Sequence, residues 1–248
     1  MGMRLSAEPT MTQLTILIPV YNEGENLRTT IDKIESAVIH PHSILVVYDH
    51  DIDTTIPVIS DLRRTLPHIA ALKNRRGPGV LNALRSGFDA VSDGAVVVCM
   101  GDASDDMDGI NEMLSLINAG YDVVCGSRYM KGGRQDGGPF FKSLLSRCAG
   151  QSLHFFTGIP THDISNSFKM FRASVVRETQ IESTGGFEIG MEITVKAFLR
   201  GRRITEVPTV WSDRTEGVSK FKLLRWLPCY LRWYYYLLFH LFLKKRIQ

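Results

Sequence analysis

AVVVCMGDASDD, residues 95–106, is the stretch that decides the fold of this chain. It opens with a run of uncharged, apolar residues, which is typical of a strand buried on both faces of a sheet. The run ends abruptly in Gly101, Asp102, Ser104, Asp105 and Asp106. Ligands of an open α/β sheet bind beyond the carboxyl ends of its strands, so these polar residues are predicted to face a binding crevice. The alternative is an acidic turn that caps the next helix.

Strand-like and helix-like patterns alternate on both sides of this stretch. Apolar runs at residues 14–18, 44–48 and 69–73 are each followed by apolar residues at helical spacing. After the acidic turn, a helical pattern covers residues 110–117, and a strand-like run follows at 122–126. Strands that alternate with helices in this way predict a mostly parallel, doubly wound α/β sheet.

The pattern changes in the second half of the chain. Residues 126–139, GSRYMKGGRQDGGP, are rich in glycine and basic side chains, which predicts a mobile loop. Beyond this loop we expect a helix around residues 144–156, an alternating stretch at 164–171, a helix near 191–199 and a strand over 203–211.

The composition limits the class of function. The formal net charge of the 248 residues is only +3, so charge alone does not indicate a nucleic-acid partner. The four cysteines lack CxxC spacing and are interpreted as thiols in a reducing compartment. The amino terminus lacks the apolar core of a signal peptide, so the sequence predicts a cytoplasmic protein.

The carboxyl-terminal tail is rich in aromatic and basic residues. Residues 226–243 read WLPCYLRWYYYLLFHLFL, and basic residues lie on both sides of them. At about 1.5 Å per residue, such a helix would only just cross a hydrocarbon core of roughly 30 Å. We therefore expect residues 223–248 to form an amphipathic helix in the membrane interface, with Trp226, Trp233 and Tyr234 on its apolar face. One alternative is a membrane-spanning helix. Another is a helix that packs in the core or in a dimer interface, and the dimer interface would make the protein a homo-oligomer.

Four loops follow the predicted strands at one edge of the sheet, and they read PVYNE, YDHDIDTT, RRGPG and MGDASDD. With these loops, residues 14–222 resemble the family-2 glycosyltransferases of the GT-A nucleotide-sugar fold, and among them the dolichol-phosphate mannosyltransferase-like branch. The motifs that carry the resemblance are, in chain order, IPVYNE, the segment 49–55, DVVCGSRY, GGFEIGMEITVKA and EVPTVWSDRTEGVSK. The resemblance implies a Rossmann-like GT-A catalytic domain over residues 1–222 and a membrane-associating tail over 223–248.

The resemblance also implies roles for individual residues. The implied catalytic residues are Asp102, Arg128, Arg214 and Lys220, and the implied substrate-binding residues are Pro19, Tyr21, Glu23, Val47, Asp49, Gly101, Lys142 and Ser219. Asp102 and Ser104 would hold Mg²⁺ or Mn²⁺ against the diphosphate of a nucleotide sugar. Arg128 would meet the acceptor phosphate, while Arg214 and Lys220 would close over the phosphates.

By this resemblance the protein is an inverting glycosyltransferase at the cytosolic face of a membrane. It would move mannose or another hexose from a GDP- or UDP-sugar to a polyprenyl or dolichyl phosphate in one in-line displacement, for which positioning and charge stabilisation suffice. One alternative is a family-2 enzyme with another saccharide or lipid acceptor. Another is a non-catalytic, nucleotide-sugar-binding membrane subunit, because Met100 replaces the first of two metal-site aspartates that the family usually has. Lys142 stands where the family has a second arginine for the acceptor phosphate.

Overall fold

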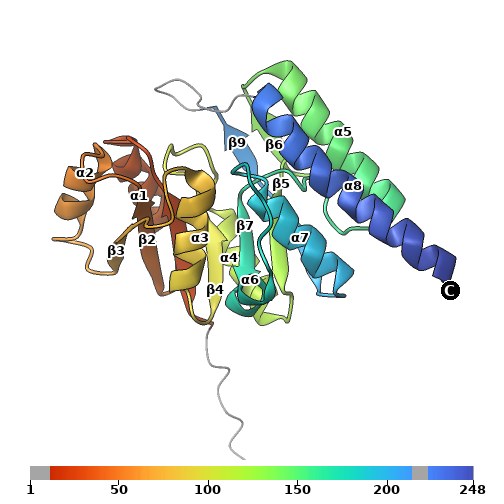
Figure 1. The fold of residues 1–248 in the computed structure, drawn as a ribbon. Coiled ribbons are helices and arrows are strands. Elements are labelled where there is room, and N and C mark those ends of the chain that lie inside the picture. The colour runs from red at the N-terminus through yellow and green to blue at the C-terminus, as the bar shows by residue number, and fades with distance from the viewer. Residues whose placement is uncertain (1–11, 214–222, 248) are drawn as a thin grey trace, which may run out of the picture.

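The computed structural model describes residues 12–213 and 223–247, which form an α/β fold (Figure 1). In these ranges the strands are β1 Leu14–Pro19, β2 His42–Tyr48, β3 Ile69–Lys73, β4 Ala95–Val98, β5 Val123–Ser127, β6 Arg134–Asp136, β7 Lys169–Arg172, β8 Ile204–Pro208 and β9 Val210–Ser212. The helices are α1 Asn26–Ala37, α2 Thr55–Leu62, α3 Val80–Ala90, α4 Gly109–Asn118, α5 Phe140–Thr157, α6 Ala173–Glu178, α7 Ile189–Leu199 and α8 Leu223–Ile247. The alternation that the sequence predicts from β1 to β5 is confirmed.

Seven of the described strands form one sheet, in the order β3-β2-β1-β4-β7-β5-β8. Strand β7 runs antiparallel to its neighbours β4 and β5, and the other neighbouring pairs in this sheet are parallel. The predicted mostly parallel sheet is therefore confirmed. Because β2, β1 and β4 are parallel neighbours, the loops that follow them leave the same edge of the sheet.

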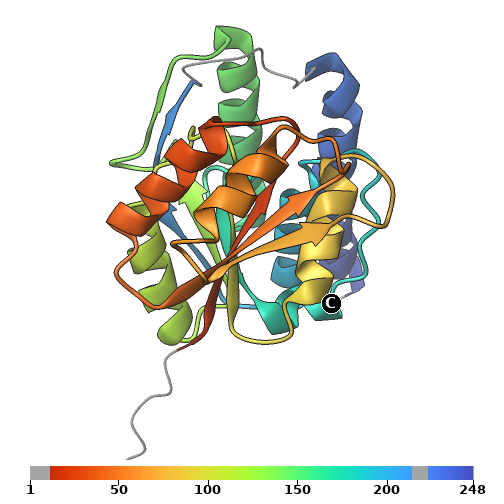
Figure 2. The ribbon, with the colours of Figure 1, turned by 90° about the vertical axis from the view of Figure 1, so that its left-hand side faces the viewer.

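Helices cover both faces of this sheet (Figure 2). Helices α1, α2 and α4 pack on one face, and α3, α6 and α7 pack on the other. Helices α5 and α8 form a further layer outside α7, at the end of the sheet away from β3 (Figure 1). Helix α7 is buried along nearly its whole length because it packs on the sheet with one side and on α8 with another.

Three segments differ from what the sequence predicts. Residues 134–136, inside the predicted mobile loop, form strand β6, which pairs in parallel with β9. The single strand expected over residues 203–211 is divided at Thr209 into β8, in the main sheet, and β9, in the two-stranded sheet. Of the alternating stretch 164–171, only the last part belongs to a strand, β7. These differences depend on pairing between segments far apart in the sequence, which local periodicity does not report.

Helix α8 packs against the body of the protein. Trp233 and Leu237 are fully buried and share a core with side chains of α5 and α7, among them Leu153 and Val195. The indole Nε1 of Trp233 donates a hydrogen bond to Ser183 Oγ, with 3.1 Å between the two atoms. The prediction that Trp233 faces the membrane is therefore wrong, because its side chain lies in the core.

The other two aromatic residues that were expected to face the membrane are partly buried. The ring of Trp226 lies 6.3 Å from that of Phe187, centroid to centroid. The hydroxyl of Tyr234 lies 3.0 Å from Ser152 Oγ on α5. Crossing a bilayer requires more length and apolarity than any helix within the described ranges has.

We expect Trp233→Phe to lower the free energy of unfolding by about 1–2 kcal/mol, because it leaves the buried Ser183 hydroxyl without its indole donor. Urea denaturation of the full chain measures this loss. Tyr235→Phe is the matched control, since Tyr235 lies on the same helix and is 62% exposed. A Trp233→Phe protein as stable as the control would show that α8 does not depend on this contact.

Candidate functional site

The loops after β1, β2 and β4 contact one another at the carboxyl edge of the sheet. The backbone N–H of Asn22 donates to Asp53 Oδ2 (3.0 Å), and that of Glu23 donates to Thr55 Oγ1 (3.1 Å). A Cβ on Gly101 would lie 3.1 Å from Val20 Cγ1 and 3.5 Å from Glu23 Cγ, so glycine lets the β4 loop lie against the β1 loop. The convergence predicted from the four loop motifs is therefore confirmed for these three loops.

Asp49 is a buried carboxylate that holds the loop before α3. Its Oδ1 accepts a hydrogen bond from Asn74 Nδ2 (2.8 Å), and its Oδ2 accepts one from the backbone N–H of Gly79 (2.7 Å). Each carboxylate oxygen can accept more than one hydrogen bond. Asp49 thus joins the β2 loop to the RRGPG loop. The predicted contact of Asp49 with a nucleotide would be a second role, in addition to this structural one.

Three further residues of the predicted nucleotide site differ in accessibility. Tyr21 is 47% exposed in the β1 loop. Pro19 is buried at the end of β1. Val47 has no exposed surface and packs in the core beneath α3. The side chain of Val47 is therefore unavailable to a substrate, which corrects its predicted role, since only its backbone lies near the loops.

Asp102 begins the acidic loop after β4. Its Oδ1 accepts hydrogen bonds from the backbone N–H of Ser104 (3.2 Å) and from Ser104 Oγ (2.6 Å). Asp105 is buried beneath this turn, and its Oδ2 accepts a hydrogen bond from the backbone N–H of Met100 (2.9 Å). Burial, and to a smaller extent the neighbouring charge of Asp102, raise the pKa of Asp105 to about 7. The helix-capping alternative is not observed, since α4 begins after Asp108 without a side-chain cap.

Arg128 follows β5 and forms a buried ion pair with Asp163. Its Nε donates to Asp163 Oδ2 (2.6 Å) and its Nη2 donates to Oδ1 (2.9 Å), which is a bidentate arrangement. The side chain of Arg128 is 10% exposed, and that of Asp163 is fully buried. Burial lowers the pKa of Arg128, but the charge of Asp163 and its hydrogen bonds outweigh this effect and raise the pKa overall. Arg128 therefore stays cationic at the floor of the site.

A cavity of about 210 Å³ lies between these residues and helices α5 and α8. Its polar lining includes Asp102, Ser104, Arg128, Gln135, Lys142, Ser143, Ser146 and Ser165. Its apolar lining includes Met100, Leu145, Ile164, Met191, Leu227, Tyr230, Leu231 and Tyr234. Helix α8 contributes Leu227, Tyr230, Leu231 and Tyr234 to this lining, and Lys142 comes from α5, so the cavity combines charged side chains with a largely apolar wall.

The structure brings together part of the predicted site. Asp102, Ser104, Arg128 and Lys142 line the cavity. Tyr21, Glu23, Asp49 and Gly101 lie in the loops at the carboxyl edge of the sheet, and Pro19 and Val47 lie in the strands. The remaining predicted residues, Arg214, Ser219 and Lys220, lie outside the described residues.

Several residues that build the site were not among the predicted site residues. Asp163 is the ion-pair partner of Arg128, and Asp53 holds the β1 loop. Lys169 is fully buried, and its Nζ donates to the carbonyl oxygens of Ile164 (3.1 Å) and Asn166. Burial lowers the pKa of Lys169. Lys169 therefore fixes the loop that forms one wall of the cavity.

The GGFEIGMEITVKA motif has a structural role in the described contacts. Glu188 Oε1 accepts a hydrogen bond from the backbone N–H of Gly185 (2.7 Å). Glu192 accepts hydrogen bonds from the backbone N–H groups of Glu182 (2.6 Å) and Ser183 (2.8 Å). Both buried acids thus fix the chain that leads into α7.

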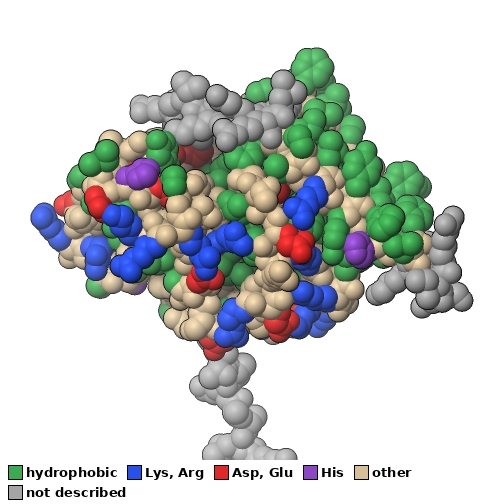
Figure 3. Space-filling view, in the orientation of Figure 1, with side chains coloured by type: hydrophobic (Ala, Val, Ile, Leu, Met, Phe, Trp, Pro, Cys, Tyr) green, Lys and Arg blue, Asp and Glu red, His purple; other side chains and the backbone are tan. Residues whose placement is uncertain are grey.

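Helices α5 and α8 carry exposed apolar side chains, visible as a green band over this side of the molecule (Figure 3). On α5 these are Phe140, Phe141, Leu144, Leu145, Phe155 and Phe156, and on α8 they are Leu231, Tyr235, Phe239, Phe242 and Leu243. We call these two sets the apolar stripes. Intervals of three and four residues place the members of each set on one side of their helix. An apolar face was predicted for α8 but not for α5.

Residues 15–179 match the profile of Glycosyl transferase family 2. The chain belongs to this family. The glycosyltransferase is 30% identical over 223 residues to the polyprenol monophosphomannose synthase of Mycolicibacterium smegmatis, covering 87% of this chain and 83% of that protein. It is 29% identical over 215 residues to the dolichol-phosphate mannosyltransferase of Pyrococcus furiosus, covering 85% of this chain and 59% of that protein. The chain therefore spans less than two thirds of the second relative.

Solved structures support the fold of the glycosyltransferase. Glucosyl-3-phosphoglycerate synthase from Mycobacterium tuberculosis, in complex with Mn²⁺, UDP and glucosyl-3-phosphoglycerate, matches with a TM-score of 0.62 and 15% identity, covering 89% of this chain and 76% of that one. The mannosyltransferase PcManGT from Pyrobaculum calidifontis, in complex with GDP-Man and Mn²⁺, matches with a TM-score of 0.58 and 16% identity, covering 87% and 61%. The predicted GT-A-like fold is thereby confirmed.

Proposed function

We propose that this glycosyltransferase moves a hexosyl group from a GDP- or UDP-sugar to a polyprenyl phosphate, with inversion at the anomeric carbon. The observation that carries the proposal is a cavity whose lining is divided between charged side chains, Asp102, Arg128 and Lys142, and apolar side chains, several of them from α8. A polyprenyl phosphate has the same division, because a dianionic headgroup is joined to a long hydrocarbon chain. The names of the polyprenol and dolichol-phosphate relatives support this acceptor class.

The charged side chains of the lining suit the acceptor phosphate. They include Lys142 and Arg128, and the buried pair with Asp163 fixes the direction of the Arg128 guanidinium. A phosphate oxygen is already a nucleophile near neutral pH, so the reaction needs positioning and charge stabilisation more than a strong base. Consistent with this, no histidine is among the described residues that line the cavity.

Asp102 and Ser104 would contribute oxygen ligands to Mg²⁺ or Mn²⁺, beside the diphosphate of the donor. These residues fit a hard cation, because both supply oxygen atoms. The Asp102 carboxylate borders the cavity, and the Ser104 Oγ lies 2.6 Å from Asp102 Oδ1. Met100 does not fit, since a thioether is a soft ligand. When bound, the cation neutralises charge that builds on the departing nucleotide. The Mn²⁺ complexes of the two structural neighbours support the use of a divalent metal.

The apolar stripes would dock the enzyme on a membrane surface. Leu145 and Leu231 belong both to the stripes and to the lining of the cavity, so the apolar wall of the cavity continues into the exposed face. Contiguous exposed apolar surface of this kind marks interaction sites in soluble proteins. A phosphate held at the depth of the lipid headgroups would then meet Arg128 and Lys142 while its chain stays against the apolar side chains of the two helices. In this proposal residues 1–222 carry the catalysis and 223–248 contribute to docking at the cytosolic face.

The proposal is tested by incubating the purified full chain with labelled GDP- and UDP-hexoses, polyprenyl phosphate in detergent, and Mg²⁺ or Mn²⁺. We expect label from one donor to enter the organic phase only when the lipid phosphate and a divalent cation are both present. Release of free sugar alone, or label confined to the aqueous phase with every donor, would argue for a different acceptor.

Lys142→Ala is expected to lower kcat/KM for the lipid phosphate about tenfold, because a charge-assisted contact to the phosphate is lost. Steady-state kinetics at saturating nucleotide sugar measure this change. Lys131→Ala is the matched control, since Lys131 is an exposed lysine of the same segment that does not line the cavity. Equal effects of the two substitutions would remove Lys142 from the acceptor site.

A further inference from the structure

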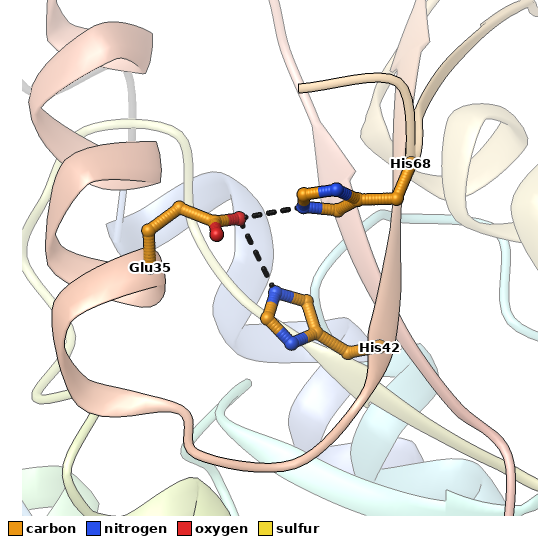
Figure 4. Close-up of side chains that lie close together, drawn as sticks. All are labelled: Glu35, His42 and His68. Carbon is orange, nitrogen blue, oxygen red and sulfur yellow. Dashed lines mark hydrogen bonds and ion pairs between the residues drawn. The ribbon is translucent and has the colours of Figure 1, made fainter. Parts of the chain in front are cut away.

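Glu35, His42 and His68 form a cluster of side chains that point toward one another (Figure 4). Glu35 lies in the last turn of α1, His42 is the first residue of β2, and His68 directly precedes β3. In parallel strands these positions belong to the amino-terminal edge, whereas Asp102 follows the carboxyl end of β4. The cluster is therefore separate from the proposed catalytic site.

The potential ligand atoms of the cluster converge on one point. Glu35 Oε1 lies 2.7 Å from His68 Nε2 and 3.3 Å from His42 Nε2. All three ligand atoms lie within 4.8 Å of one another. Ligands around a tetrahedral zinc ion at about 2.0 Å are roughly 3.3 Å apart, so small side-chain movements would admit the ion.

The hydrogen bond on the far side of His42 fixes which ring nitrogen carries a proton. His42 Nδ1 lies 2.8 Å from the carbonyl oxygen of His40, and a carbonyl can only accept, so Nδ1 bears the hydrogen. In the neutral ring Nε2 then presents a lone pair toward the carboxylate of Glu35. Two acceptors that face each other at 3.3 Å need a proton or a cation between them. This orientation, with Nδ1–H bound to a backbone carbonyl, is the arrangement that metal-ligating histidines adopt.

The backbone holds this cluster rigidly. His42 pairs with Leu14 of β1, and the carbonyl oxygen of His68 accepts a hydrogen bond from the N–H of Ile44 (3.1 Å). The two imidazole rings are nearly perpendicular, with 5.3 Å between their centroids. The side chain of His42 is 7% exposed and that of His68 is 31% exposed, so an ion could enter from the side of His68.

We propose that Glu35, His42 and His68 bind one Zn²⁺ ion. Two imidazoles and a carboxylate are the ligand types that zinc takes and that Mg²⁺ and Ca²⁺ do not favour. One carboxylate and two neutral rings leave a net negative site, which matches the charge of the cation. The ion would join α1 to the amino-terminal ends of β2 and β3, with a water molecule in the fourth position.

The test uses the full chain without a purification tag, stripped of metal and then dialysed against Zn²⁺ in excess Mg²⁺, which fills hard oxygen sites. Elemental analysis gives the zinc content per chain, and competition with a chelator gives the affinity. We expect one zinc per chain. Removal of a residue that only hydrogen-bonds to a metal ligand weakens metal binding roughly 10- to 100-fold. Because His68 is proposed as a direct ligand, His68→Gln should weaken zinc binding by more than this.

Two controls separate this site from other zinc ligands. His240→Gln removes an exposed histidine of α8, and Asp102→Asn removes the proposed catalytic carboxylate, and both proteins should keep their zinc. Glu35→Gln, which keeps the size of the side chain, is the second cluster variant in case His68→Gln does not fold. A wild-type chain that binds no zinc overturns the proposal. This is the result expected if a proton on His42 already balances the negative charge of the Glu35 carboxylate. Zinc content that is unchanged in a folded cluster variant also overturns it.

Discussion

Asp102→Asn is expected to reduce kcat for sugar transfer by about 100- to 1,000-fold, the size of effect seen when a preorganised electrostatic contact to developing charge is removed. The substitution removes the charge that would hold the divalent cation. It keeps an oxygen that can still accept the hydrogen bonds from the backbone N–H and the Oγ of Ser104. The turn should therefore survive, and the loss should appear in turnover and not in the free energy of unfolding.

Asp108→Asn provides the control for this prediction. Asp108 belongs to the same acidic loop, is exposed and does not line the cavity. Its substitution should leave kcat unchanged within about twofold, because surface charges in water are strongly screened. If both variants retain full activity, or if the wild type works in excess chelator, the cation does not sit at Asp102.

The double substitution Phe141→Ser and Phe155→Ser on α5 is expected to lower the partition of the protein into anionic liposomes about 1,000-fold. Each phenylalanine contributes about 2 kcal/mol when its ring leaves water, and about 4 kcal/mol corresponds to roughly three powers of ten. The two side chains are 75% and 81% exposed, so their loss should not disturb the core. Sedimentation with vesicles measures the partition.

Ile39→Ser is the control for membrane binding. Ile39 is an apolar side chain that is 80% exposed, and it lies beyond the end of α1, outside the apolar stripes. Its substitution should leave vesicle binding unchanged. Neither phenylalanine lines the cavity, so turnover with polyprenyl phosphate in detergent should persist in the double variant. Unaltered vesicle binding of the double variant would mean that α8 docks without α5.

The sequence predicted those features that depend on local pattern. The buried strands β1, β2 and β4 are short apolar runs that end in polar loops, and their parallel order follows from the helices between them. Asp102 was identifiable because a carboxylate directly follows such a strand. The loop contacts around Gly101 followed from the same topology.

Features that depend on distant partners were not predicted. Arg128 was expected at the acceptor phosphate, but its bidentate partner Asp163 lies 35 positions away, and nothing local links the two. Trp233 was assigned to the membrane because it lies on the broad apolar face of an amphipathic helix, and only the packing of α5 and α7 shows that part of this face is buried. The stripe on α5 was missed because an apolar helical pattern does not reveal which of its faces remains exposed.

The most direct measurement compares initial rates of transfer from one nucleotide sugar to three acceptors in the same detergent, namely a polyprenyl phosphate, the corresponding polyprenol and a short alkyl phosphate. Because the cavity lining combines charged side chains with a largely apolar wall, the account predicts rapid transfer to the polyprenyl phosphate. The polyprenol should be inert, because it lacks the anionic nucleophile, and the short phosphate should be a poor acceptor, because it lacks the chain. Transfer to the polyprenol as fast as to its phosphate, or transfer to the short phosphate as fast as to the polyprenyl phosphate, would contradict the account.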